Sequence, residues 1–181
     1  GGHSMAQLDE QLAKLEKSLQ ENPKNVNGWM LLARTNDALK RFDKAAAAYE
    51  KLSALVDGET KAEVLADWAD CLAAKNGSLD GKPEELVDQA LKISPKLWKA
   101  LALKGTAYYN RNQFKEAAAT WEKVLADQKP GSEDYQSVLN MVNDARTKAG
   151  MKPLTGPLPV WNRVRCQKRP EASVWCRSPG P

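Results

Sequence analysis

Three carboxylates share one face of a predicted helix. Glu63, Asp67 and Asp70 are separated by four and three residues, a spacing that aligns side chains along a helix. Paired acids can act as general acid and base or hold a metal ion. Both chemistries usually need further groups, yet the only histidine is His3 and no glycine-rich phosphate loop is present. We therefore expect no enzyme, no catalytic residue and no metal site. The acids then form either a binding surface or an ordinary solvated face.

The elements around these acids are helix pairs. Between residues 98 and 130, two stretches with apolar side chains at spacings of three and four predict two helices, Trp98 to Tyr109 and Phe114 to Ala126. Gly105 and Ala117 are small, so the two helices can approach closely. The sequence therefore predicts a hairpin of two antiparallel helices.

The same arrangement recurs along the chain. Trp29, Leu65 and Leu101 stand at equivalent places, 36 residues apart each time. We expect repeats near residues 26–59, 62–97 and 98–130, a leading half-repeat at 6–23 and a capping helix at 132–149. A fixed period of this length is typical of helix-pair solenoids, whose open end needs a cap. Together these elements predict a domain spanning residues 6–152.

The two ends of the chain differ from this domain. Residues 1–5 look like an expression-vector remnant, and a native membrane anchor can stand ahead of Ala6 in the full-length protein. Residues 153–181 are rich in proline and arginine and carry the whole net charge of +4, because residues 1–152 hold 22 basic and 22 acidic side chains. The tail fits either a disordered extension or a non-native stretch, and it can contact its own or a neighbouring groove. The neutral domain has no basic field for nucleic acid.

Cysteine usage adds no metal or haem motif. Cys71 lies in a predicted helix and is expected to be a small buried residue. Cys166 and Cys176, with nine residues between them, can pair in an oxidising compartment, and the sequence leaves this open. The chain has no Cys-x-x-Cys-His motif, so we expect it to carry no haem and no other cofactor.

Within residues 98–130, the large apolar Leu101, Gly105 four positions on, Tyr108 three further on and the terminal Pro130 resemble the tetratricopeptide repeat. The resemblance implies an all-α, right-handed superhelix of antiparallel helix pairs with a C-terminal capping helix. In such solenoids the first helix of each pair lines the concave side. Counting from Val26, Ala62 and Trp98 as repeat starts gives the predicted peptide-binding residues, which we call the inner face: Asn27, Met30, Leu31, Arg34, Asp37, Glu63, Ala66, Asp67, Asp70, Lys99, Leu103, Thr106 and Tyr109.

A narrower resemblance covers about residues 7–152. It is carried by Pro83-Glu84-Glu85-Leu86, the run from Ala100 to Gly105, Ala119-Thr120-Trp121-Glu122 and Pro130-Gly131-Ser132. These stretches are similar to the tetratricopeptide domain of bacterial cytochrome c maturation proteins of the CcmI, CycH and NrfG type. The resemblance implies a periplasmic domain, membrane-anchored in the full-length protein. It also implies binding of the C-terminal helix of apocytochrome c and its presentation to the haem ligation subunits.

A tetratricopeptide domain can have other binding roles. A chaperone cofactor that grips a C-terminal carboxylate needs inward Lys, Asn and Arg residues at set positions of the three repeats. In this sequence those positions hold Met30, Arg34, Asp67, Lys99 and Leu103, of which only Lys99 matches, and Asp67 would repel a carboxylate. A general periplasmic scaffold for assembling other envelope complexes remains the alternative. An inner face with acids at its centre and apolar residues beside them suits a basic amphipathic helix.

Overall fold

Helix hairpins follow one another along the chain in the computed structural model, which describes residues 4–156. The leading helix is α1 (Met5–Glu21), and the hairpins are α2 (Val26–Ala38) with α3 (Phe42–Ser53), α4 (Gly58–Asn76) with α5 (Lys82–Ile93), and α6 (Trp98–Asn110) with α7 (Phe114–Asp127). The last helix is α8 (Glu133–Lys148). The described residues form helices and connecting turns without a strand. The predicted all-α architecture is confirmed.

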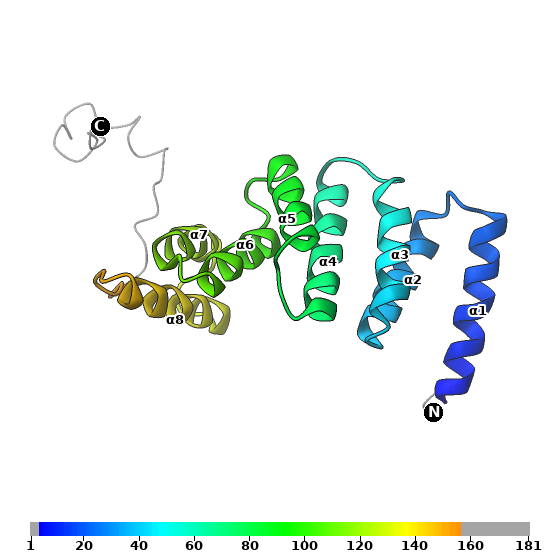
Figure 1. The fold of residues 1–181 in the computed structure, drawn as a ribbon, viewed down its shortest axis with the longest axis horizontal. Helices are drawn as coiled ribbons and strands as arrows, with labels where there is room; N and C mark the ends of the chain where they lie inside the picture. The colour runs from blue at the N-terminus through cyan, green and yellow to red at the C-terminus, as the bar shows by residue number, and fades with distance from the viewer. Residues whose placement is uncertain (1–3, 157–181) are drawn as a thin grey trace.

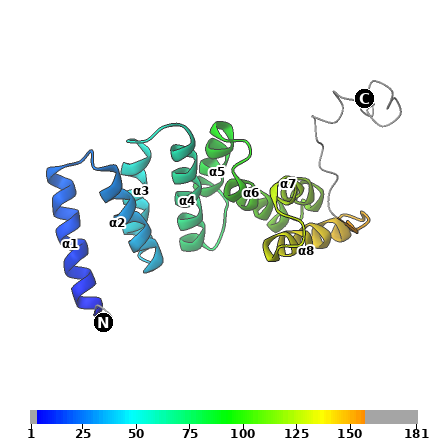
Figure 2. The same cartoon turned by 180° about the vertical axis from the view of Figure 1, so that it is seen from behind.

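The helices stack in sequence order into an elongated superhelix. Each helix packs on the next one along the chain, and α4 also contacts α6. Figure 1 shows α1 and α8 at opposite ends of the stack, and Figure 2 shows the same order from behind. The core is accordingly divided into three hydrophobic clusters along the stack. Each repeat therefore buries its apolar side chains mainly against its neighbours, as solenoid repeats do.

The hairpin of α6 and α7 is closed by a glycine and a tryptophan. A Cβ atom on Gly105 would overlap the indole of Trp121. The indole N–H of Trp121 donates a hydrogen bond to the Ala102 carbonyl oxygen at 3.1 Å. The close helix approach predicted at Gly105 is therefore present, and it fixes where α6 places its other side chains.

The leading helix begins within the stretch interpreted as a vector remnant. The Ser4 hydroxyl accepts a hydrogen bond from the Gln7 backbone N–H at 3.3 Å, and the Gln7 side chain accepts one from the Ser4 N–H at 2.9 Å. This reciprocal pair is a capping box, which stabilises a helix start. Further along α1, Leu12 and Leu19 are buried in the first hydrophobic cluster together with residues of α2 and α3. The unpaired first helix thus joins the stack.

The cap and the start of the tail also have defined positions. Ser132 caps α8 by accepting a hydrogen bond from the Tyr135 N–H at 3.1 Å. Residues 153–156, which the sequence assigned to the tail, contact α8. The rest of the tail, including Cys166 and Cys176, lies outside the described residues.

Candidate functional site

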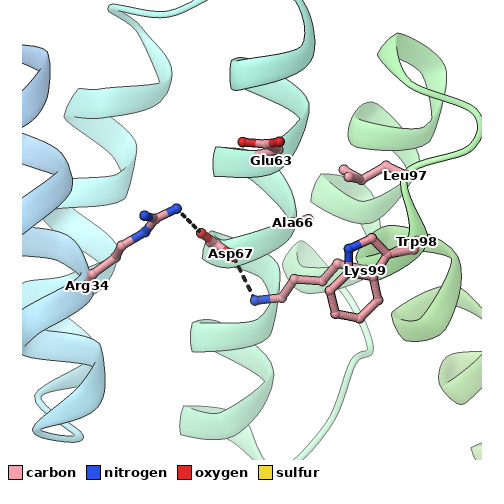
Figure 3. A pocket seen from close by; sticks show the side chains of 7 residues that line it. All are labelled: Arg34, Glu63, Ala66, Asp67, Leu97, Trp98 and Lys99. Carbon is pink, nitrogen blue, oxygen red and sulfur yellow. Dashed lines mark hydrogen bonds and ion pairs between the residues drawn. The ribbon is translucent and has the colours of Figure 1, made fainter. Parts of the chain in front are cut away.

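Ion pairs connect the first helices of the three repeats along the inner face. The Arg34 guanidinium on α2 lies 3.4 Å from the Asp67 carboxylate on α4. The Lys99 ammonium on α6 lies 2.7 Å from Asp67 and 3.0 Å from Asp70. Figure 3 shows Arg34 and Lys99 reaching Asp67 from opposite sides. Three elements far apart in sequence therefore bring these predicted residues together.

These pairs neutralise part of the acidic centre. The inner face carries four carboxylates and two cations, a net charge of −2, and Asp67 and Asp70 are already partnered. Burial lowers the pKa of Lys99, but its bonds to Asp67 and Asp70 outweigh that effect and raise the pKa above its usual value. Because the pairs are partly exposed, each contributes at most about 1 kcal/mol to stability. Lys99 therefore stays charged and keeps Asp67 engaged.

Glu63 differs from the other two acids of its helix. Its side chain is exposed and forms no ion pair with any residue in 4–156. It lies at one side of a hollow of about 170 Å3 between α4 and the start of α6. The hollow is lined by Arg34, Glu63, Ala66, Asp67, Leu97, Trp98 and Lys99. Glu63 is thus the carboxylate of this hollow that is available to a ligand.

Trp98 and Leu97 were missed by the sequence interpretation. Trp98 is 60% exposed, whereas most large apolar residues of the stack are buried. Trp98 is the first residue of α6, ahead of the buried residues Ala100 and Leu101. That position, an aromatic residue outside the core stripe at a helix start, is the signal that could have placed it on the surface. An exposed tryptophan beside a carboxylate can bind apolar or cationic groups.

The remaining predicted residues of α2 and α4, together with Leu103 of α6, line or support this surface. Leu31 is 58% exposed, and Asn27, about one helical turn before it, is also exposed. Met30 is half-buried against the first hydrophobic cluster, and Leu103 against the second. Ala66 is 0% exposed and forms the floor of the hollow. The part of the inner face built by α2, α4 and the start of α6 is called the open stretch below.

Tyr109 and Thr106 occupy a different setting at the end of α6. The Tyr109 hydroxyl donates to the Asp144 carboxylate and accepts from the Lys148 ammonium, both on α8. The Lys148 nitrogen also lies 4.5 Å from the centre of the Tyr109 ring. The Thr106 hydroxyl donates to the Ala102 carbonyl oxygen of its own helix at 2.9 Å. The part of the inner face between α6 and α8 is called the covered end.

Asp37, on α2 in the open stretch, lies close to the buried Cys71 of α4. Burial raises the pKa of the Asp37 carboxyl, and the nearby Asp70 adds to the rise while the Cys71 thiol opposes it. Burial, together with Asp37, raises the pKa of the Cys71 thiol to about 12. The thiol is therefore protonated and unreactive near neutral pH. The prediction of a buried cysteine is confirmed, since Cys71 is 1% exposed.

The described part of the chain offers little for metal chemistry. Within residues 4–156 no group of three or more His, Cys, Asp or Glu side chains is arranged to hold a metal ion. A second hollow, of about 360 Å3, lies between α1, α2 and α3 and is lined mainly by Trp29, Leu32, Ala47 and Ala48. It holds no residue of the inner face and serves below as a comparison site.

The sequence matches a family model over residues 3–135. The family is described as the tetratricopeptide domain of cytochrome c-type biogenesis protein H. The chain belongs to this family. It is also 31% identical over 155 residues to the cytochrome c-type biogenesis protein CycH of Pseudomonas aeruginosa, covering 83% of this chain and 37% of that protein. The family links the domain to cytochrome c maturation, and the chain spans little more than a third of this relative.

Solved structures share the fold of this family member. Two crystal structures of MamA superpose with TM-scores of 0.66 and 0.63, each at 16% sequence identity. The first similarity covers 81% of each chain, and the second covers 80% of this chain and 74% of the other. At that identity the likeness concerns the fold alone.

Proposed function

We propose that the open stretch binds the C-terminal helix of an apocytochrome c and presents that chain to the haem ligation subunits. The observation that carries the proposal is the pairing of exposed Trp98 with unpartnered Glu63 around one hollow. Leu31 adds a second exposed apolar side chain on the same inner face. Membership of a cytochrome c biogenesis family supports this choice of ligand.

The surface chemistry fits an amphipathic helix with basic residues on one edge. Apolar side chains of the ligand would cover Trp98 and Leu31, while a Lys or Arg would reach Glu63. Helices bind in grooves through such anchors spaced along one face. The net charge of −2 favours a cationic partner and makes association sensitive to salt. The inner-face residues of the open stretch are the candidates for binding, with Glu63 and Leu31 the most accessible and Trp98 and Leu97 added to them. Thr106 and Tyr109 lie at the covered end, outside the proposed contact.

The proposal treats the domain as a binding module without a reaction of its own. The positioned groups are ion-paired side chains, a protonated thiol and apolar residues, none of which forms a nucleophile with its base. We further propose a periplasmic setting and an anchor elsewhere in the full-length protein. No helix in the described range is both long and apolar enough to cross a membrane.

The test is a titration of the full chain with a fluorescent peptide that copies an apocytochrome c C-terminal helix. We expect binding with a dissociation constant on the order of micromolar, weakened as salt is raised. A second peptide of the same length, with its basic residues changed to glutamate, should bind at least about tenfold more weakly. Equal binding of both peptides would contradict the proposal and favour a general scaffold role.

A charge reversal assigns this binding to the hollow. Glu63→Lys should lower the affinity for the peptide by about 3- to 10-fold, the effect of one partly exposed charge contact. Glu50→Lys on α3 is the matched control, because Glu50 is an exposed glutamate on a second helix. The same loss in both variants would mean that only overall charge matters. Reversal of Asp67 is less informative, since it would also break the pairs with Arg34 and Lys99.

A further inference from the structure

The chain turns back on itself directly after α8. Gly150 has a φ of 72°, in the left-handed region that glycine adopts without strain. The Gly150 N–H donates to the Thr147 carbonyl oxygen at 3.0 Å, and the Met151 N–H donates to the Arg146 carbonyl oxygen at 2.8 Å. This pair of bonds is a Schellman motif, which ends a helix and reverses the chain. Residues 152–156, called the strap, then run back along α8.

The strap is held through its backbone. The Asn143 side-chain oxygen accepts from the Leu154 N–H at 2.7 Å, and its amide nitrogen donates to the Leu154 carbonyl oxygen at 3.1 Å. The Arg146 side chain donates to the Lys152 carbonyl oxygen at 2.7 Å. The Tyr135 hydroxyl donates to the Gly156 carbonyl oxygen at 3.4 Å. All three partners come from α8, at spacings of eight and three residues that place them on one helical face.

This face of α8 presents hydrogen-bonding groups that match the backbone of an extended peptide. A primary amide that pairs with both the N–H and the C=O of one residue recognises a main chain and ignores its side chain. Arg146 is fixed from behind by the Glu122 carboxylate of α7, at 2.5 Å. Side-chain selection comes from Leu154, which packs on the third hydrophobic cluster, whereas Lys152, Pro153 and Thr155 are exposed. One aliphatic side chain is therefore required, and its neighbours are free to vary.

We propose that Tyr135, Asn143 and Arg146 form a second peptide-binding site, separate from the inner face, whose ligand is an extended polypeptide segment carrying an aliphatic residue. The strap occupies this site as an intramolecular ligand, and a partner's segment binds by displacing it. The four polar contacts and the single apolar anchor of the strap define what a partner must present. The site does not depend on the helix proposed as ligand of the open stretch.

Tethering explains how the site is regulated. A ligand joined by a short linker competes at an effective concentration of millimolar or more. The turn at Gly150 already directs the strap along α8, so a free peptide of equal contacts binds the wild-type chain poorly. Removing the side chain of Leu154 should release the strap and leave Asn143 available to a peptide added in trans.

The test uses the full chain and a fluorescent peptide copying residues 151–156. Leu154→Asp should bind this peptide at least about tenfold more tightly than the wild-type chain does, because the tethered competitor is gone. Adding Asn143→Ala to Leu154→Asp should abolish the gain, and the matched control Thr155→Ala should behave as wild type. Equal affinity of wild type and Leu154→Asp, or full binding after loss of Asn143, would overturn the proposal.

Amide hydrogen exchange tests the proposal without relying on the folding of the Leu154→Asp variant. In the wild-type chain the Leu154 amide should exchange at least about tenfold more slowly than the Thr155 amide, and Asn143→Ala should remove this protection. Unprotected exchange at Leu154 in the wild-type chain would also overturn the proposal, because the strap would then not occupy the site.

Discussion

The open stretch and the covered end use the same repeat positions in different ways. In the open stretch, Leu31 and Trp98 are more than half exposed and Glu63 has no charged partner in the described part of the chain. At the covered end, Tyr109 is bonded to Asp144 and Lys148 of α8. A position on the inner face is therefore available for binding only where the neighbouring helix leaves it unpartnered.

The carboxylates of the two regions show the same contrast. Burial raises the pKa of Asp37 in the open stretch. Hydrogen bonds from Tyr109 and Lys148 lower the pKa of Asp144 at the covered end. The protein stabilises the charged form of one acid and disfavours that of the other. Where the protein satisfies its own polar groups, little remains for a ligand to gain.

The largest expected effect comes from the hairpin of α6 and α7, because α6 contributes residues to both regions. Gly105→Ala would force the Trp121 indole away from α6, and overpacking of this kind costs about 1–3 kcal/mol of unfolding free energy. Urea unfolding followed by circular dichroism measures the loss. Thr106→Ala, at the next residue, should cost less than about 1 kcal/mol, since only a bond within the helix is lost. Equal stability of Gly105→Ala and wild type would mean that α6 and α7 are not packed this closely.

The next effect separates the two regions by ligand binding. Trp98→Ala should lower the affinity for the apocytochrome peptide by about 10- to 100-fold, as expected for an aromatic anchor at the centre of an interface. The control is Ile93→Ala on α5, an apolar side chain that is 41% exposed and does not line the hollow. Fluorescence anisotropy measures both. A loss no greater in Trp98→Ala than in Ile93→Ala would remove the hollow from the binding site.

The sequence predicted the fold well because its signals are local and repeated. The 36-residue spacing, Gly105 and the capping serine at 132 each specify a local geometry that stacking then extends. The split of the inner face was less predictable. Whether Asp67 is free or paired depends on Arg34 and Lys99, which lie 33 and 32 residues away in the chain. The strap escaped prediction because backbone recognition by Asn143 leaves no pattern in the side chains it binds.

A smaller effect concerns pH. Above its raised pKa the ionised Asp37 costs stability, so the chain loses stability as pH rises from about 3.8 through that pKa. Asp37→Asn should therefore raise the melting temperature near neutral pH but not below about pH 3. The measurement is thermal unfolding at both pH values. A variant less stable than wild type near neutral pH would show that Asp37 is stabilised rather than strained by its surroundings.

Asp144 should respond with the opposite sign. Its pKa is lowered, so its stabilising effect is complete above about 3.8 and is lost as pH falls through the lowered value. Asp144→Asn should lower the melting temperature near neutral pH, and the difference should shrink in acid. If the melting temperatures of the Asp37 and Asp144 variants changed in the same way with pH, the two regions would not differ in their electrostatics.

The smallest expected effect is at the covered end. Tyr109→Phe removes a hydroxyl that is engaged by α8, so affinity for the apocytochrome peptide should change by less than about twofold. The same titration measures it, with Trp98→Ala as the sensitive comparison. A loss as large as that of Trp98→Ala would mean that the ligand reaches Tyr109 and that α8 moves to admit it.

The most direct test is nuclear magnetic resonance of the isotope-labelled full chain during titration with the apocytochrome helix peptide. We predict saturable shifts of the Trp98 indole N–H and the Leu31 methyl groups, with the Tyr109 and Leu154 amides unchanged. Saturable shifts confined to α8, or to Trp29 in the hollow between α1 and α3, would contradict a binding surface on the open stretch.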